Sequence, residues 1–305
     1  MKRIICIMLM LAVMLCGGAG LAEDGKLSVV VTDFPCYDFA RAAAGDMAEI
    51  TMLIKPGSEV HSYEPTPSDV IAMTEADLFI YIGGESDSWV DNMLASIGGD
   101  APQTLRMFDC VEACDDDDHA NHDHADGHEH EYDEHIWTSP VNAMAMVDAV
   151  CEALTEIDTA NADYYRQNAA EYNGQIAGID AQIRELVENA ARTELIFGDR
   201  FPFLYLAREY GLTYHAAFPG CAAETEPSAQ TIMELIMKVA KDNIPVVYVI
   251  EMSTGNVASA IAEETGAEIV TLHSIQNVSA DEFEAGETYV SIMQKNVEAL
   301  GKGLN

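Results

Sequence analysis

A stretch rich in histidine and acidic residues, 115–135, has the clearest chemistry in the chain. Its imidazole and carboxylate groups are donors that bind divalent metal ions. The stretch has no apolar periodicity and little to bury, so we expect a mobile loop that collects metal ions, with a solvated acidic linker as the alternative. The accessory metal-binding residues expected in it are His119, His122, His124, His128 and His130.

The last histidine of the stretch, His135, differs from the others because apolar residues resume directly after it, at Ile136 and Trp137. This change predicts that His135 is anchored to a folded body. We therefore expect loop 115–134 to be an accessory segment, and His135 alone to belong to a folded metal site.

Other coordinating side chains follow predicted strands. His61, Asp199, Glu251 and His273 each come directly after a segment with strand character. Ligands of open α/β sheets bind beyond the carboxyl ends of the strands, so we expect these residues to meet His135 in one cleft. Imidazole with carboxylate and without cysteine favours zinc, with manganese and iron less favoured.

Structural roles are open for several of these side chains. Asp199 could cap the helix that follows it or pair with Arg200, and Glu251 could bind the helix start near Thr254. His215 lies within a predicted strand, so we expect it to be packed, or to support a metal ligand rather than bind the metal.

Strands and helices alternate along the chain, and this alternation indicates where the coordinating residues are placed. The predicted strands are Leu27–Asp33, Glu49–Ile54, Asp77–Gly83, Thr104–Phe108, Glu194–Phe197, Thr213–Phe218, Pro245–Ile250 and Glu268–Leu272. The predicted helices are Cys36–Ala44, Ser68–Glu75, Asp87–Ile97, Pro140–Glu156, Asp158–Ala190, Pro202–Tyr210, Pro227–Lys241, Gly255–Thr265 and Asp281–Leu300. The pattern predicts an α/β fold with two lobes, each a mostly parallel four-stranded sheet flanked by helices.

One long helix is predicted to join the lobes. Apolar residues from Tyr165 to Leu186 recur at steps of four and three and form a single stripe. A coiled-coil dimer is an alternative, but Gly174 and Gly178 lie near the short stripe, so we expect a rigid intramolecular spine and a monomer. The predicted division is a signal peptide at 1–22, an N-terminal lobe at 23–157, the connecting helix at 158–190 and a C-terminal lobe at 191–305.

Composition restricts the possible partners. The formal net charge is -37, which disfavours nucleic acid and anionic lipid and leaves cations as expected ligands. The chain has no Walker A motif, so any ATP hydrolysis belongs to a partner, and it has no HExxH motif of a zinc hydrolase. Cys110 and Cys114 could close a disulfide at the base of the histidine-rich loop, or be small buried side chains.

Residues 1–22 have the organisation of a secretory signal peptide. Two basic residues precede an apolar segment that is too short to span a bilayer stably, and small residues lead up to Ala22. We expect cleavage after Ala22 and export across the cytoplasmic membrane, to the periplasm or the cell surface. A lipid anchor at Cys16 is the disfavoured alternative, because Leu15 occupies the position where a small residue is expected.

Several motifs resemble those of the extracytoplasmic substrate-binding proteins of zinc and manganese ABC transporters. The resemblance runs from about Leu27 to Leu300, and its motifs are Phe34-Pro35, Tyr37–Ala40, the HSYEPTP segment His61–Pro67 and the DEHIWTSP segment Asp133–Pro140. It implies two lobes bridged by a rigid helix, a metal ion in the cleft, and a histidine-rich loop before the second ligand histidine.

The resemblance also implies a ligand set. Family ligands match His61 and His135, and the third position, normally histidine or glutamate, falls at Gly198-Asp199-Arg200, so Asp199 is carried over. The fourth ligand position, usually an acidic residue, matches His273. A histidine there adds a nitrogen ligand to the site, which favours zinc over manganese. The implied function is high-affinity capture of Zn²⁺ outside the cytoplasm and delivery to an ABC permease, without chemical turnover. The alternatives are a manganese- or iron-binding transporter component, a secreted zinc hydrolase and a metal-storage protein.

Overall fold

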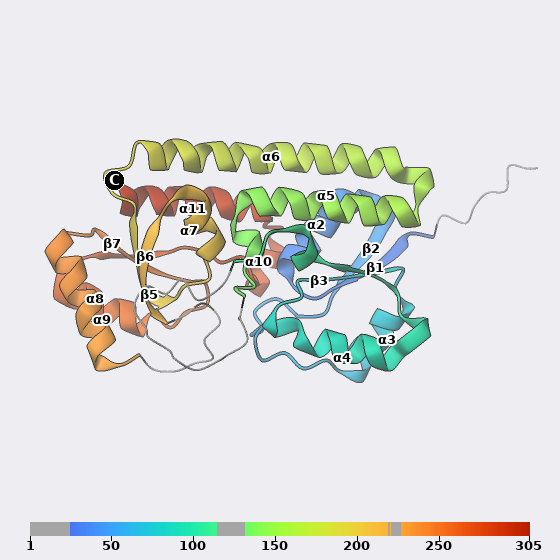
Figure 1. Cartoon of the computed structure of the whole chain (residues 1–305), viewed down its shortest axis with the longest axis horizontal. Coiled ribbons are helices and arrows are strands. Elements are labelled where there is room, and N and C mark those ends of the chain that lie inside the picture. Colours follow the sequence, from blue (N-terminus) through green and yellow to red (C-terminus); the bar gives the residue numbers. More distant parts are fainter. Residues whose placement is uncertain (1–24, 115–131, 219, 221–226) are drawn as a thin grey trace, which may run out of the picture.

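The computed structural model describes residues 25–114, 132–218, 220 and 227–305. They form two lobes side by side (Figure 1), each with a four-stranded parallel sheet. The N-terminal sheet has the order β2-β1-β3-β4 and the C-terminal sheet the order β6-β5-β7-β8. The strands are β1 (Leu27–Val31), β2 (Ala48–Met52), β3 (Leu78–Tyr81), β4 (Gln103–Arg106), β5 (Glu194–Arg200), β6 (Thr213–Phe218), β7 (Val246–Val249) and β8 (Glu268–Thr271). The predicted fold class is therefore confirmed.

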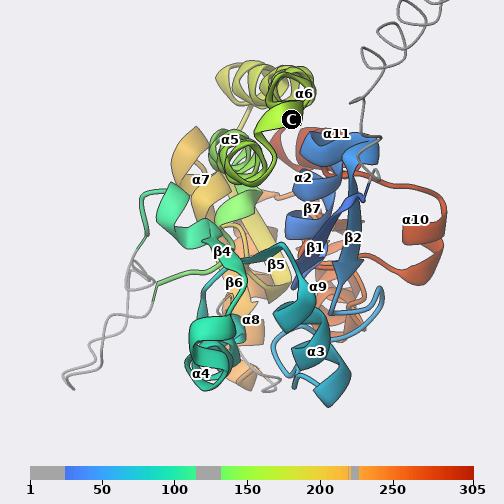
Figure 2. The same cartoon turned by 90° about the vertical axis from the view of Figure 1, so that its right-hand side faces the viewer.

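Helices cover both faces of the sheets, and Figure 2 shows α3 and α4 on the side of the N-terminal sheet opposite α5 and α6. Strands covered on both faces have continuous apolar sequences, because side chains on both sides are buried. An example is β3, Leu-Phe-Ile-Tyr, in which all four residues are buried. The shorter flanking helices are α2 (Phe34–Ala44), α3 (Pro67–Glu75), α4 (Ser88–Ile97), α7 (Leu204–Tyr210), α8 (Ala229–Asp242) and α9 (Asn256–Thr265). The start of α3 is fixed by a capping box between Thr66 and Asp69, with Pro67 at the first helical position.

Three long helices form a layer across both lobes (Figure 1): α5 (Pro140–Ile157), α6 (Ala162–Glu188) and α11 (Tyr289–Leu304). Helix α6 connects the lobes and packs on α5, α2 and α11. Its apolar stripe is buried as predicted, from Tyr165 through Ile176 to Ile183. The stripe thus packs within the chain, which supports an intramolecular spine.

The segment predicted as one helix, Asp281–Leu300, contains two helices, α10 (Ala280–Glu284) and α11. Gly286 takes a left-handed φ of 74°, which breaks the helix, and Thr288 starts α11 with a capping box that includes Ser291. The pattern missed this break because the apolar spacing continues across it.

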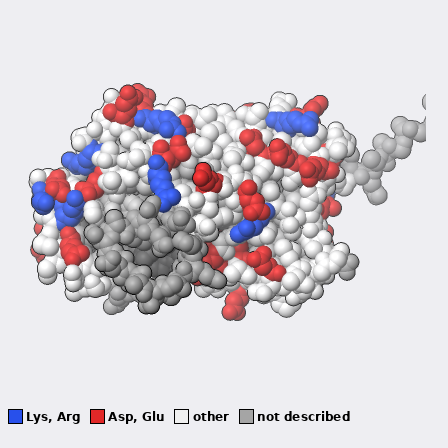
Figure 3. All heavy atoms as spheres, in the orientation of Figure 1, with Lys and Arg blue, Asp and Glu red and all other residues white. Residues whose placement is uncertain are grey.

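The remaining predictions fall partly outside the described residues. The signal peptide 1–22, Cys16 and the accessory loop histidines at 119–130 lie there. Cys110 and Cys114 have free thiols, and none of the described helices is long and apolar enough to cross a membrane. On the face in Figure 3, acidic side chains are spread over both lobes, often beside Lys or Arg.

Candidate metal centre

Three side chains converge beside the inter-lobe contact: His61, Glu134 and His135. One ligand atom from each lies within 4.8 Å of the others, and the centroids of the two imidazole rings are 5.9 Å apart. His61 lies in the loop after β2, and the other two lie just before the short 3₁₀ helix Ile136–Thr138. Among the described residues this is the one group of three or more His, Cys, Asp or Glu side chains close enough to hold a metal ion.

Asp133 orients His135. Its Oδ1 accepts a hydrogen bond from the backbone N–H of His135 at 2.8 Å and lies 3.0 Å from Nδ1 of the same ring. Both side chains are buried, and Tyr205 donates to the Asp133 carbonyl at 2.8 Å. With Nδ1–H directed to the carboxylate, Nε2 is the nitrogen that can donate to a metal ion, an arrangement typical of protein-bound metals.

Glu134 and Ser86 orient His61 in a similar way. Nδ1 of His61 lies 2.8 Å from Ser86 Oγ and 3.3 Å from Glu134 Oε1. Glu134 also accepts hydrogen bonds from the Ser86 N–H at 2.8 Å and from its hydroxyl at 2.5 Å. The carboxylate is thus engaged by three donors. Because Nδ1 of His61 faces Ser86 and Glu134, Nε2 is the nitrogen of this ring that is left to bind a metal ion.

The electrostatic state of Glu134 fits this role. Burial alone raises the pKa of the carboxyl, but the hydrogen bond from His61, the neighbouring His135 and the two hydrogen bonds from Ser86 outweigh it and lower the pKa to about 2. Glu134 is therefore ionised at neutral pH. Gly84 makes room for it, because a Cβ at Gly84 would come within 2.2 Å of the Glu134 Cβ.

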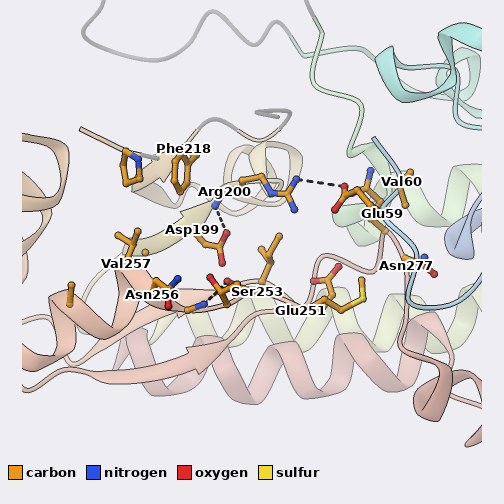
Figure 4. A pocket seen from close by; sticks show the side chains of 18 of the residues that line it. Glu59, Val60, Asp199, Arg200, Phe218, Glu251, Ser253, Asn256, Val257 and Asn277 are labelled. Atoms are coloured by element: carbon orange, nitrogen blue, oxygen red, sulfur yellow. Dashed lines mark hydrogen bonds and ion pairs between the residues drawn. The ribbon is translucent and has the colours of Figure 1, made fainter. Parts of the chain in front are cut away.

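Asp199 and Glu251 lie in a different part of the inter-lobe region. Both line a cavity of about 610 Å³, to which the N-terminal lobe contributes the loop around Glu59. Asp199 and Glu251 come from the carboxyl ends of the neighbouring strands β5 and β7, and Figure 4 shows Arg200 pointing toward Glu59. Oδ1 of Asp199 accepts from the Arg200 N–H, whereas Oδ2 is buried and has no hydrogen-bond partner within the described residues.

Glu251 and His273 contact each other rather than the three-residue group. Glu251 accepts from the Ser274 N–H at 2.7 Å and from its hydroxyl, and not from the helix start near Thr254. His273 is buried, with Nδ1 3.6 Å from Glu251 and Nε2 3.8 Å from Glu282. Burial lowers the pKa of His273, but these carboxylates outweigh it and raise the pKa.

His215 is neither packed nor next to a metal ligand. It lies on β6 with about half of its side chain exposed, and its Nε2 is 3.0 Å from Glu194 on the neighbouring strand β5. Its ring reaches solvent because β6 is an edge strand of the C-terminal sheet.

Two carboxylates of the centre, Asp133 and Glu134, were not expected from the sequence. They were assigned to the accessory loop, yet both are 2% exposed and belong to the folded body. The sequence feature that could have identified them is their position next to His135, immediately before the apolar segment. Sequence proximity did not reveal that Glu134 reaches His61 from the other loop.

The fold and this centre define a class: a two-lobed α/β metal-binding protein with a helical spine between the lobes. The chain belongs to the family described as the zinc-uptake complex component A, periplasmic, which it matches over residues 29–303. Members of this family are solute-binding proteins of ABC transporters and not enzymes.

Curated relatives support this membership. The chain is 32% identical over 290 residues to the high-affinity zinc uptake system protein ZnuA of Bacillus subtilis, covering 94% of this chain and 90% of the relative. It is 31% identical over 280 residues to the zinc-binding lipoprotein AdcA of Streptococcus pneumoniae, covering 91% of this chain. The chain spans 56% of the length of AdcA, so the two proteins correspond over part of AdcA only.

Solved structures share the fold. The Zn(II)-bound ZnuA-like domain of Streptococcus pneumoniae AdcA matches with a TM-score of 0.77 and 29% identity, covering 92% of this chain and 99% of that domain. The metal-dependent lipoprotein YcdH of Bacillus subtilis matches with a TM-score of 0.78 and 30% identity, covering 92% of this chain and 99% of the other.

Proposed function

We propose that this chain captures Zn²⁺ in the inter-lobe region and delivers it to an ABC permease, without chemical turnover. The observation that carries the proposal is the convergence of His61 and His135, each with Nδ1 held by a carboxylate so that Nε2 can bind a metal ion. Neutral imidazole is a preferred zinc ligand, and orientation by a carboxylate raises its basicity.

The C-terminal lobe would supply the remaining ligands, Asp199 and His273. The buried Oδ2 of Asp199 lacks a hydrogen-bond partner within the described residues, so it has the capacity to accept a cation. To complete a tetrahedral site with His61 and His135, these two side chains would move toward the histidines on zinc binding, because neither belongs to the three-residue group. The resulting set of three nitrogens and one oxygen favours zinc over manganese. Glu134 would orient His61 rather than bind zinc, because three donors already engage its oxygens.

Family membership supports the place and the partner that we propose for this activity. The family is described as periplasmic and as a component of a zinc-uptake complex, and the AdcA relative is named a zinc-binding lipoprotein. We therefore infer an exported protein that works outside the cytoplasmic membrane beside a permease, with ATP hydrolysis in a partner subunit. Loop 115–131 would be an accessory collector of zinc.

Titration calorimetry with zinc, and metal analysis of the protein as purified, test the proposal. Wild-type protein is expected to bind one zinc ion tightly, and His61→Ala and His135→Ala each to weaken this binding by at least about 100-fold, because each removes a direct ligand. His215→Ala is the matched control, since this exposed histidine lies away from the centre. Tight zinc binding that persists in His61→Ala would contradict the assignment.

A further inference from the structure

One short segment of the C-terminal lobe, 273–278, contacts both N-terminal segments that carry the histidines of the centre. Trp137, two residues after His135, donates from Nε1 to the Ser274 carbonyl at 2.7 Å. The loop before His61 is held further along the same segment by Asn277. The C-terminal lobe therefore touches both halves of the centre through one connection after β8.

Asn277 makes the larger share of this contact. Its side-chain amide is buried, and Nδ2 donates to the carbonyls of Lys55 at 2.9 Å and Ser58 at 2.8 Å. The amide group has two N–H bonds, so both are used on one turn of the partner lobe. The N–H of Gly57, inside that turn, donates back to the Val278 carbonyl at 2.7 Å.

The conformation of segment 273–278 is fixed from its own lobe. Ile275 is buried with a φ of 66°, a left-handed conformation that is unusual for a β-branched residue. Its N–H donates to Nδ1 of His273 at 2.9 Å, and Glu251 accepts from the N–H of Ser274. Such a conformation persists only where the surrounding contacts determine it, so Asn277 is presented to the other lobe by a rigid support.

We propose that Asn277 is a positioning residue for zinc binding, and this rests on the proposed function. His61 is three residues beyond Ser58, so the two hydrogen bonds from Asn277 set where the imidazole stands relative to the C-terminal lobe. When zinc is bound by groups of both lobes, dissociation requires His61 to move away from the opposite lobe. The hydrogen bonds from Asn277 oppose that movement, so they slow zinc release more than they affect zinc capture.

Asn277→Asp tests this, because aspartate has nearly the same shape but no N–H donors, and it places a carboxylate against two carbonyls. Zinc release is followed by stopped flow with a chelating indicator on zinc-loaded protein. We expect dissociation about tenfold faster, the scale seen when an outer partner of a metal ligand is removed, with the association rate unchanged. Asn277→Ser has a hydroxyl one bond too short to reach these carbonyls and adds no charge, so it should also release zinc faster than wild type.

A matched control is Asn168→Asp, which also removes an amide that donates to a backbone carbonyl, that of Ala43, but between α6 and α2. It should leave zinc release unchanged. Hydrogen exchange at the Gly57 amide reports the loop directly and should be faster in Asn277→Asp and Asn277→Ser than in wild type. This readout does not depend on zinc.

The outcomes separate the two levels of inference. Failure of wild-type protein to bind zinc would reject the proposed function. If wild type binds zinc and either Asn277 variant releases it at the wild-type rate, the positioning role is overturned, whether or not exchange at Gly57 changes. Equal acceleration in Asn168→Asp would also overturn it, because the effect would then reflect a general loss of stability. Asn277→Ser decides the question if Asn277→Asp does not fold.

Discussion

The carboxylate of Glu134 contacts the imidazole of His61, with Oε1 3.3 Å from Nδ1, although 73 residues separate the two positions in the chain. The side chain of Glu134 is 3% exposed and that of His61 is 16% exposed. A buried, ionised carboxylate therefore fixes a histidine that solvent can still reach.

Glu134→Gln is expected to weaken zinc binding by about 10- to 100-fold, because the neutral amide no longer raises the basicity of His61 or holds its orientation. Titration calorimetry of the variant and wild type measures the change. Glu156→Gln is the control, since Glu156 is a carboxylate with an exposed hydrogen bond to Gln103, far from the centre in the fold. An unchanged zinc affinity in Glu134→Gln would show that the contact has no part in binding.

Gly84→Ala is expected to destabilise the protein by about 1–3 kcal/mol and to weaken zinc binding, because the new Cβ would lie 2.2 Å from the Glu134 Cβ. Gly99→Ala is the control, because a Cβ there meets no heavy atom within 4 Å. Denaturant unfolding and zinc titration measure the two effects. Equal behaviour of the two alanine variants would argue against the close packing of Gly84 on Glu134.

Asp87→Asn should stabilise the protein increasingly as pH rises. Burial and the charge of Glu134 raise the pKa of Asp87 from the usual 3.8 to about 7, although the N–H groups of Gly83 and Ile82 oppose the shift. Below pH 3.8 the Asp87 carboxyl is protonated in both the folded and the unfolded protein. Between pH 3.8 and about 7 it ionises only in the unfolded protein, so the wild type loses stability as pH rises.

Asparagine is neutral throughout and can still accept from both N–H groups, so it removes this loss. The Tm difference between Asp87→Asn and wild type should grow between about pH 4 and pH 7 and reach roughly 5 °C. Thermal unfolding of the zinc-free proteins across that range measures it. A difference that does not vary with pH would mean that Asp87 does not retain its proton in the folded state.

Replacement of residues 115–131 by a short Gly-Ser link should leave one tight zinc site with unchanged affinity. The flanks of this segment are already adjacent, because the N–H of Asp133 lies 3.3 Å from the Cys114 carbonyl. Calorimetry should show that only weaker sites disappear, since the removed histidines are expected to bind zinc without a folded frame. If the shortened protein lost the tight site, that site would lie in the loop. If the shortened protein keeps it, the further substitution His135→Ala should abolish tight zinc binding.

Much of the fold could be predicted because its signals are local. Strands such as β1, β3 and β7 appear where Val, Ile and Phe gather, and the start of α3 is set by Thr66 and Pro67. The stripe on α6 is a periodicity within one helix. The break at Gly286 was missed because a single left-handed residue and a new N-cap at Thr288 leave the apolar spacing intact.

The candidate site was predictable only in part. His61 and His135 were recognised from their motifs, and they do lie together. Asp199 and His273 remain predicted ligands, placed on the opposite lobe, and His215 turned out to be exposed. The contribution of Glu134 could not be foreseen, because it depends on which loop faces it after folding.

The sequence by itself determined the two α/β lobes, the helical spine and the presence of histidines suited to zinc, because periodicity, capping and side-chain chemistry are properties of nearby residues. Only the tertiary structure decided which atoms meet: Glu134 with His61, Asp133 with His135, and Asn277 with the turn before His61. The reason is physical. Such contacts depend on the packing of distant segments, where changes of about an ångström decide whether a hydrogen bond forms.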